Sequence, residues 1–169
     1  MFDSHTKKIT IPVVDGSVHF KNQPSLNDVL KQGPVIPPEV AHMLMRFRSG
    51  KIVFVLDVEK AFLQVFLHEE DRDVTRILWL KDITKFTRVL LGLNVSPFLL
   101  AATISFHLKE HANKDLAREI SIGLYVDDLL ITTDEDHLSA INTYKQLKSI
   151  FNEMNMNLRE FRSNSGEFN

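Results

Sequence analysis

The 169-residue sequence has no cysteine, no long apolar run and no excess of one charge. Without cysteine, a disulfide scaffold, a cysteine-ligated zinc site and a thiol nucleophile are excluded. No apolar run approaches the roughly 18 residues of a membrane-spanning helix, so no membrane partner is expected. The 20 Lys and Arg nearly balance the 22 Asp and Glu. Binding of nucleic acid through overall positive charge is therefore not expected, and contacts with phosphate groups must come from local patches.

The remaining composition is that of an ordinary globular domain. Hydrophobic residues make up 44% of the chain and charged residues 25%, which distinguishes it from a disordered segment. A single domain of this length buries about 70% of the surface that its unfolded chain exposes. The sequence contains no internal repeat, low-complexity tract or linker that would divide it.

Hydrophobic periodicity and the positions of Gly and Pro predict the secondary structure. Residues 1–36 are rich in turn-forming residues and are predicted to be irregular. Three helices are predicted, over 37–49 with Gly50 as the stop, over 98–111 with Ser96 as the N-cap, and up to Met154 with Asp134 as the cap. Strands are predicted at 52–56, 62–67, 74–80, 85–90, 120–126, 129–132 and 156–161.

In this order the elements predict an α+β fold, a mostly antiparallel sheet with its helices packed on one face. The run 52–56 is continuously apolar and rich in β-branched residues, which is typical of a central strand buried on both faces. The segment 98–111 is apolar nearly all round, which predicts a buried helix. Asp127 and Asp128 separate two apolar strands and predict a tight hairpin.

Asp127 and Asp128 are also the first candidates for chemistry. Two adjacent carboxylates repel each other, and such a pair has a raised pKa or recruits a cation. For an arbitrary Asp-Asp pair a solvated hairpin tip is the more common explanation, because Asp favours turns. Asp57 ends the predicted central strand and is a weak candidate by itself. Together, the three carboxylates could share Mg²⁺, which prefers oxygen ligands and assists phosphoryl or nucleotidyl transfer.

Three segments resemble the motifs of reverse transcriptases in order, spacing and residue type. Tyr125-Val126-Asp127-Asp128, between apolar strands, looks like the Tyr-x-Asp-Asp box of that family. Seventy residues before Asp127, the segment Leu56-Asp57-Val58-Glu59-Lys60-Ala61-Phe62 resembles the first catalytic motif. Between them, Leu91-Gly92-Leu93-Asn94-Val95-Ser96-Pro97-Phe98 resembles a glycine turn that leads into a Ser-Pro helix.

The closer resemblance is to the reverse transcriptases of Pao-type (BEL/Pao) retrotransposons, and it covers nearly the whole chain. It implies a polymerase palm with partial fingers, in which residues 1–50 are a partial fingers segment and 51–169 are the palm. Both would belong to one reverse transcriptase domain over 1–169, with the thumb and the RNase H domain absent. The segments that carry it include Pro24-Ser25-Leu26-Asn27-Asp28, Leu44-Met45-Arg46-Phe47-Arg48, Leu67-His68-Glu69-Glu70-Asp71-Arg72-Asp73 and Leu158-Arg159-Glu160-Phe161-Arg162-Ser163-Asn164.

The resemblance implies roles for particular residues. Asp57, Asp127 and the backbone carbonyl of Val58 would hold two Mg²⁺ ions, for which Mn²⁺ is a possible substitute, and Asp128 would lie beside them as a third catalytic carboxylate. Tyr125 and Val126 would contact the primer end. The residues expected at the nucleotide are Val58, Lys60, Ala61, Phe62, Leu91 and Gly92.

Two of these assignments have simple alternatives. Phe62 would lie under the nucleotide sugar and exclude a 2′-hydroxyl, but it also fits the core face of a strand. Gly92 fits any turn. The sequence also departs from the family where Leu90-Leu91-Gly92 replaces the usual Pro-Phe-Gly, and residues 5–23 resemble an unrelated insertion.

The first functional hypothesis is an RNA-directed DNA polymerase, probed by templated extension. Its partners would be a primer-template of RNA or DNA, dNTP and the remainder of a retrotransposon polyprotein. If the chain belongs to an active element, it would act inside the cell, in the cytoplasm within a virus-like particle. The alternatives are an inactive retrotransposon remnant that binds nucleic acid and, less well supported, a two-metal nucleotide cyclase.

Overall fold

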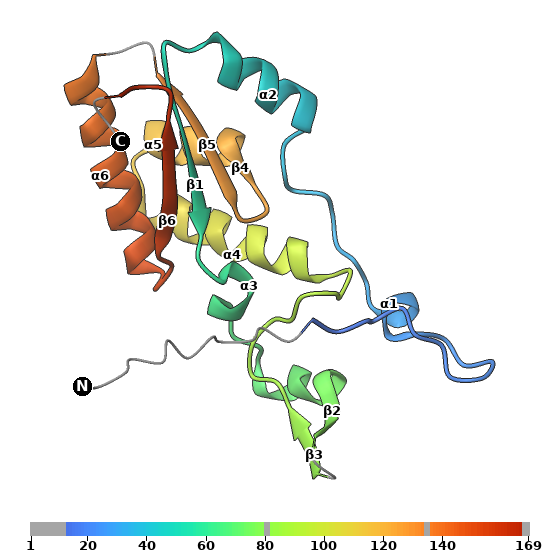
Figure 1. The fold of residues 1–169 in the computed structure, drawn as a ribbon. Helices are drawn as coiled ribbons and strands as arrows, with labels where there is room; N and C mark the ends of the chain where they lie inside the picture. Colours follow the sequence, from blue (N-terminus) through green and yellow to red (C-terminus); the bar gives the residue numbers. More distant parts are fainter. Residues whose placement is uncertain (1–12, 80–81, 134–135, 167–169) are drawn as a thin grey trace, which may run out of the picture.

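The computed structural model describes residues 13–79, 82–133 and 136–166 (Figure 1). It is a mixture of helices and antiparallel sheet, which confirms the predicted α+β class. The helices are α1 (Leu26–Val29), α2 (Val40–Ser49), α3 (Ala61–Gln64), the 3₁₀ helix η1 (Glu69–Thr75), α4 (Ser96–His111), α5 (Lys114–Gly123) and α6 (His137–Glu153). The strands are β1 (Ile52–Val58), β2 (Arg76–Trp79), β3 (Asp82–Lys85), β4 (Leu124–Tyr125), β5 (Asp128–Thr133) and β6 (Leu158–Ser163).

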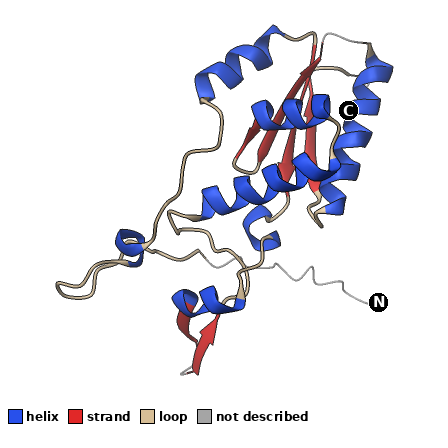
Figure 2. Ribbon diagram, turned by 180° about the vertical axis from the view of Figure 1, so that it is seen from behind, coloured by secondary structure: helices blue, strands red, loops and turns tan. Residues whose placement is uncertain are grey.

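The main sheet has four strands in the order β4-β5-β1-β6, and every neighbouring pair is antiparallel. Strands β2 and β3 form a separate two-stranded sheet away from it. Helices α4, α5 and α6 all lie on one face of the main sheet, as the two opposite views show (Figures 1 and 2). Among the described residues, no helix layer covers the other face, which leaves that face open for a site.

Strand β1 shows this asymmetry residue by residue. Phe54, Leu56 and Val58 are at most 1% exposed and belong to the core beneath the helices. The residues between them, including Asp57, point to the other face and are only half-buried. The prediction that this central strand is buried on both faces was therefore wrong, because helices cover one face alone.

Two predicted strands between β1 and α4 are not formed. The apolar segment 62–67 contains the helical turn α3, in which Ala61 and Phe62 are buried, and its remainder makes only an isolated bridge from Phe66 to Arg88. The predicted strand 85–90 is replaced by β3, which ends at Lys85 and pairs with β2. Short apolar runs satisfy the packing needs of a strand and of a helical turn equally well, so their pattern does not separate the two.

Helix α5 was not predicted. Its last four residues, 120–123, were instead assigned to the start of a strand. Asn113 caps the helix, since its Oδ1 accepts a hydrogen bond from the backbone N–H of Leu116 over 2.7 Å. Ile120 is fully buried, and Leu116 and Ala117 pack against the same core. The spacing i, i+1, i+4 of these apolar residues belongs to a helix, and only Leu124 and Tyr125 remain for the strand.

At the start of α4, Ser96 has a different role from the one predicted. Ser96 is the first helical residue rather than the N-cap, and its hydroxyl donates to the carbonyl of Leu90 over 2.6 Å while being buried. One stripe of α4 packs in the core, but Phe106 is 69% exposed, so the helix is not buried all round.

At α6 the cap is Asp136, whose carboxylate accepts from the N–H of Ser139. The predicted cap, Asp134, lies outside the described residues.

Residues 13–50 are irregular apart from two helices. The predicted irregular segment contains the single-turn helix α1. Helix α2 ends before Gly50 as predicted, although Gly50 adopts an extended conformation (φ −81°) instead of a left-handed one. An ion pair between Arg46 and Glu119 joins α2 to α5. Within the described ranges, no helix has the length and apolar character needed to cross a membrane.

Candidate active site

The hairpin between β4 and β5 places the two adjacent carboxylates. Tyr125 pairs with Asp128, so Val126 and Asp127 form a two-residue turn. Val126 has a φ of +58°, the sign that the first central residue of a tight hairpin turn requires. Because β-branched residues rarely adopt this conformation, the turn stores backbone strain, which is common at functional sites.

Asp57 joins these carboxylates from the neighbouring strand. In the register of β1 and β5, Asp57 lies directly opposite Asp128, so the two side chains project from the same face of the sheet. The backbone N–H of Val58 donates to the carbonyl of Asp127 over 2.8 Å, which ties the turn to the end of β1. We call Asp57, Asp127 and Asp128 the acidic corner. It lies on the sheet face opposite to α4, α5 and α6.

The acidic corner is electrostatically crowded. Partial burial raises the pKa of Asp128 above its ordinary value of 3.8. The negative charges of Asp127 and Asp57, and then that of Glu160, raise this pKa further. Carboxylates that repel one another in this way favour either a bound proton or a bound cation.

Arg159 on β6 supplies a positive charge to the corner. It lies opposite Asp57 on the other side of β1, and its Nε donates a hydrogen bond to Asp57 Oδ2 over 2.7 Å. This bond raises the pKa of the Arg159 guanidinium above its ordinary value, with a smaller contribution from the charge of Glu59. Sequence reasoning missed Arg159, because only the pairing of β6 with β1 brings it to a residue 102 positions away.

The donor atoms at the corner are oxygens, the kind of ligand that a hard divalent cation prefers. The predicted set consists of two carboxylates and the backbone carbonyl of Val58, and oxygen ligands of this kind suit Mg²⁺. Across residues 13–79, 82–133 and 136–166, no three His, Cys, Asp or Glu side chains are grouped so that they could hold a metal ion. The chemical case for a cation therefore rests on the oxygen donors and on the crowding at Asp128, and further ligands would have to come from substrate phosphates or water.

The predicted nucleotide residues that follow β1 lie at a sharp bend. Lys60 has a φ of +52° and connects β1 to α3, which begins at Ala61. Its ammonium group is 3.8 Å from a carboxylate oxygen of Glu59. Phe62 is 7% exposed and packs in the hydrophobic core, where the simpler of its two interpretations placed it.

Leu91 and Gly92 lie in a second turn, which is held by the N-terminal segment. The N–H of Val14 donates to the carbonyl of Leu91 over 3.0 Å. Gly92 has a φ of +101°, and an added Cβ would lie 1.7 Å from the carbonyl oxygen of Val14. The turn therefore requires glycine, as the simpler interpretation of Gly92 predicted. In the described part of the chain, no hydrogen bond or ion pair joins Leu91 or Gly92 to the acidic corner.

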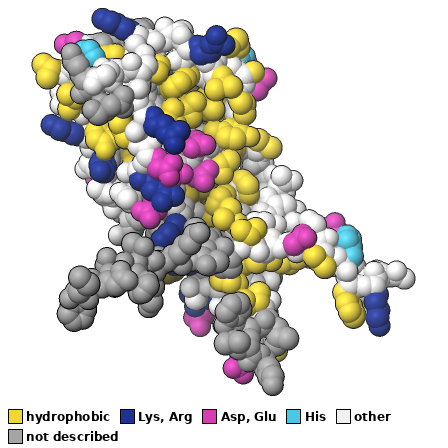
Figure 3. All heavy atoms as spheres, in the orientation of Figure 1, with side chains coloured by type: hydrophobic (Ala, Val, Ile, Leu, Met, Phe, Trp, Pro, Cys, Tyr) yellow, Lys and Arg dark blue, Asp and Glu magenta, His cyan; other side chains and the backbone are white. Residues whose placement is uncertain are grey.

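The predicted primer residues line a cavity that the sequence did not reveal. It has a volume of about 540 Å³ and lies between the segment that leads into α2, the start of α4 and the β4–β5 turn. Tyr125 and Val126 thus share one wall with Asn94, Pro97 and Phe98. On the face of the molecule seen in Figure 3, acidic and basic side chains gather next to a band of hydrophobic side chains.

An antiparallel sheet with helices on one face, and with carboxylates on adjacent strands beside a tight hairpin, is consistent with the palm of a nucleic-acid polymerase. Residues 3–163 match the family described as reverse transcriptase (RNA-dependent DNA polymerase). The chain belongs to the reverse transcriptase family, and by this resemblance it is an RNA-directed DNA polymerase. Members of this family use divalent metal ions and bind primer-template and dNTP. No curated protein matched the chain.

Proposed function

We propose that the acidic corner is the active site of an RNA-directed DNA polymerase that adds dNTP to a primer 3′-OH on an RNA or DNA template. The observation that carries this proposal is the register that sets Asp57 opposite Asp128, with Asp127 tied to Val58 in the adjoining turn. The corner faces the side of the sheet without helices, where an extended primer-template has access.

In the proposed reaction the primer 3′-oxygen forms a bond to the α-phosphorus of the dNTP. The bond from that phosphorus to the bridging oxygen breaks, and pyrophosphate leaves with the electron pair. Asp57, Asp127 and the Val58 carbonyl would hold two Mg²⁺ ions or, as a substitute, Mn²⁺. The chemistry that such ions supply is activation of the attacking hydroxyl and stabilisation of charge on the leaving group. Asp128 would add negative charge next to the two ions.

The remaining residues would bind and orient the substrates. The backbone N–H groups of Lys60 and Ala61 would face the triphosphate, and Phe62 would support the sugar from the core side. Leu91 and Gly92 would shape the nucleotide pocket from the second turn. Tyr125 and Val126 would contact the primer end, and their place in the wall of the 540 Å³ cavity supports this assignment.

The subtype and the wider context are also part of the proposal. The segments quoted above support a BEL/Pao retrotransposon origin, with this domain as part of a polyprotein that acts in cytoplasmic virus-like particles. Residues 1–50 would belong to the fingers and 51–169 to the palm. The boundary is supported by the end of α2 at Ser49 and the start of β1 at Ile52.

The test is primer extension on an RNA template with dNTPs and Mg²⁺ or Mn²⁺. Asp127→Asn should abolish extension, because it removes a metal-binding charge and keeps the side-chain volume. Asp115→Asn is the matched control, since Asp115 is exposed in the first turn of α5 and its loss should leave extension unchanged. Circular dichroism would verify folding of all three proteins.

A folded wild-type chain that binds primer-template but does not extend it would overturn the polymerase proposal. That result would support the inactive nucleic-acid-binding module instead. Cyclisation of a nucleotide without a template would point to the cyclase.

A further inference from the structure

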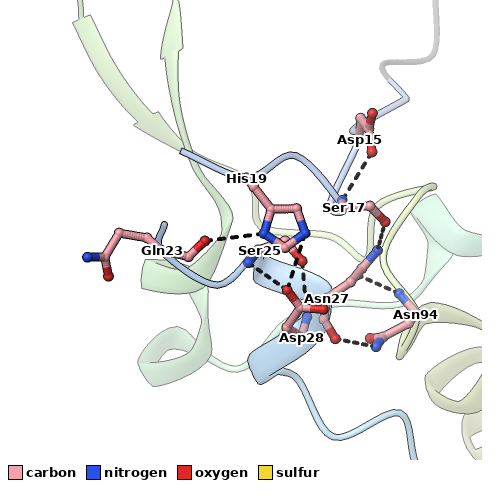
Figure 4. A network of polar contacts seen from close by, with 8 residues as sticks. All are labelled: Asp15, Ser17, His19, Gln23, Ser25, Asn27, Asp28 and Asn94. Carbon is pink, nitrogen blue, oxygen red and sulfur yellow. Dashed lines mark hydrogen bonds and ion pairs between the residues drawn. The ribbon is translucent and has the colours of Figure 1, made fainter. Parts of the chain in front are cut away.

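Asn27 in α1 uses all of its polar groups to join three segments of the chain (Figure 4). Its Nδ2 donates to Ser17 Oγ over 3.1 Å and to the carbonyl of Gly92 over 3.2 Å. Its Oδ1 accepts from the backbone N–H of Asn94 over 2.9 Å. Its backbone N–H donates to the carbonyl of Gly16 over 2.8 Å, and its backbone carbonyl accepts from Asn94 Nδ2 over 2.7 Å.

Val14 also contacts the turn formed by residues 91–94, to which Asn27 is bonded. The Val14 N–H donates to the Leu91 carbonyl, and the Val14 carbonyl occupies the space where a Gly92 side chain would be. The turn 91–94 is therefore clamped between Val14 and Asn27. Both clamping residues precede β1, far from the turn in sequence.

We propose that Asn27 is a positioning residue for nucleotide binding, which holds the turn 91–94 in its productive shape. The inference rests on the proposed function, in which Leu91 and Gly92 shape the nucleotide pocket. Asparagine suits this task, because its amide supplies a donor for the Gly92 carbonyl and an acceptor for the Asn94 N–H at once.

The side chain of Asn27 is not needed to form its own helix. Helix α1 is capped by a reciprocal pair in which Ser25 Oγ accepts from the N–H of Asp28 and the Asp28 carboxylate accepts from the N–H of Ser25. The amide of Asn27 instead points to the turn 91–94 (Figure 4). Asn94 in turn lines the cavity that Tyr125 and Val126 share, so Asn27 also fixes a residue of that wall.

This separation of roles provides a matched pair of variants. Asn27→Ala removes the side-chain bonds to the turn but keeps the cap of α1. Ser25→Ala weakens the cap but keeps every bond from Asn27 to the turn. Two quantities would be measured in wild type and in both variants: the hydrogen-exchange rate of the Asn94 backbone amide, and the KM for dNTP in primer extension.

We expect Asn27→Ala to accelerate exchange at Asn94 and to raise the KM for dNTP about tenfold, which corresponds to the loss of one or two hydrogen bonds. The kcat should change less than KM. Ser25→Ala should leave both the Asn94 exchange rate and the KM close to wild type. Asn27→Asp keeps the acceptor and loses the donor, so it should protect the Asn94 amide while still raising KM.

Three results would overturn the inference. If Asn94 exchange is unchanged in Asn27→Ala, Asn27 does not hold the turn. If exchange accelerates but KM stays at the wild-type value, or if Ser25→Ala raises KM equally, the network serves stability alone. Failure of the proposed function is distinct, because the wild-type protein would then not extend a primer, while the exchange rates would still show whether Asn27 holds the turn.

Discussion

Arg159 donates a hydrogen bond from its Nε to Asp57 Oδ2 over 2.7 Å, and the two residues are cross-strand partners in β6 and β1. The carboxylate proposed to bind metal is thus paired with a cation that belongs to the same sheet. A second contact, from Arg159 Nη1 to Glu59 over 3.8 Å, extends the pairing. Arg159 therefore offsets part of the negative charge that the acidic corner collects.

Arg159→Gln should lower the melting temperature of the metal-free protein, because it leaves the acidic corner without this counter-charge. The decrease should be larger at low salt, where repulsion between exposed charges is less screened. The same change should tighten binding of Mn²⁺, since Asp57 no longer has a competing partner. Thermal unfolding and a Mn²⁺ titration measure the two effects.

The control for Arg159 is Arg162→Gln, which changes an exposed arginine on the same strand. It should leave both the melting temperature and Mn²⁺ binding near wild type. Equal effects of the two substitutions would show that the net charge of β6 matters and the bond to Asp57 does not.

The raised pKa of Asp128 predicts how stability changes with pH. Because the folded protein holds this proton more tightly than the unfolded chain, the contribution of Asp128 to stability falls as pH rises from 3.8 through its raised folded pKa. At neutral pH the charged Asp128 carboxylate therefore lowers the free energy of unfolding. Asp128→Asn should therefore raise the melting temperature at pH 7, and the gain over wild type should shrink below pH 3.8.

The contribution of Asp136 to stability should change with pH in the opposite direction. Its pKa is lowered by hydrogen bonds from Ser139 at the start of α6, so it contributes stability above the unfolded pKa that is lost as pH falls. Asp136→Ala should lower the melting temperature at pH 7. If Asp128→Asn also lowers it there, repulsion at the acidic corner is not the dominant effect.

Gly92→Ala should destabilise the fold by about 2 kcal/mol or more, because it combines a positive φ with an overlap against backbone. The new Cβ would overlap the Val14 carbonyl, so Val14 or the turn itself would have to move. Urea denaturation measures the free energy of unfolding. Gly166→Ala is the control, since a Cβ at Gly166 has no heavy atom within 4 Å and should be neutral.

Much of the fold was predictable because it depends on local pattern. The apolar run of β1, the hairpin before β5 and helices α2, α4 and α6 all have signals longer than one turn or bounded by clear turn residues. Two of the errors fell at 62–67 and 120–123, where four to six residues are compatible with a strand or with a helical turn. Residues 61–64 and 120–123 are helical, and Phe62 and Ile120 within them belong to the hydrophobic core.

The sequence by itself determined the chemistry available to this protein: the order of the carboxylates, the tight turn between β4 and β5, and the family. Only the tertiary structure decided which groups meet. Strand order β4-β5-β1-β6 sets Asp57 between Asp128 and Arg159, and the path of residues 13–30 brings Asn27 to Gly92. These pairs join residues 65 to 102 positions apart. Local periodicity carries no information about residues so far apart in the sequence. Sheet register and core packing decide which of them meet.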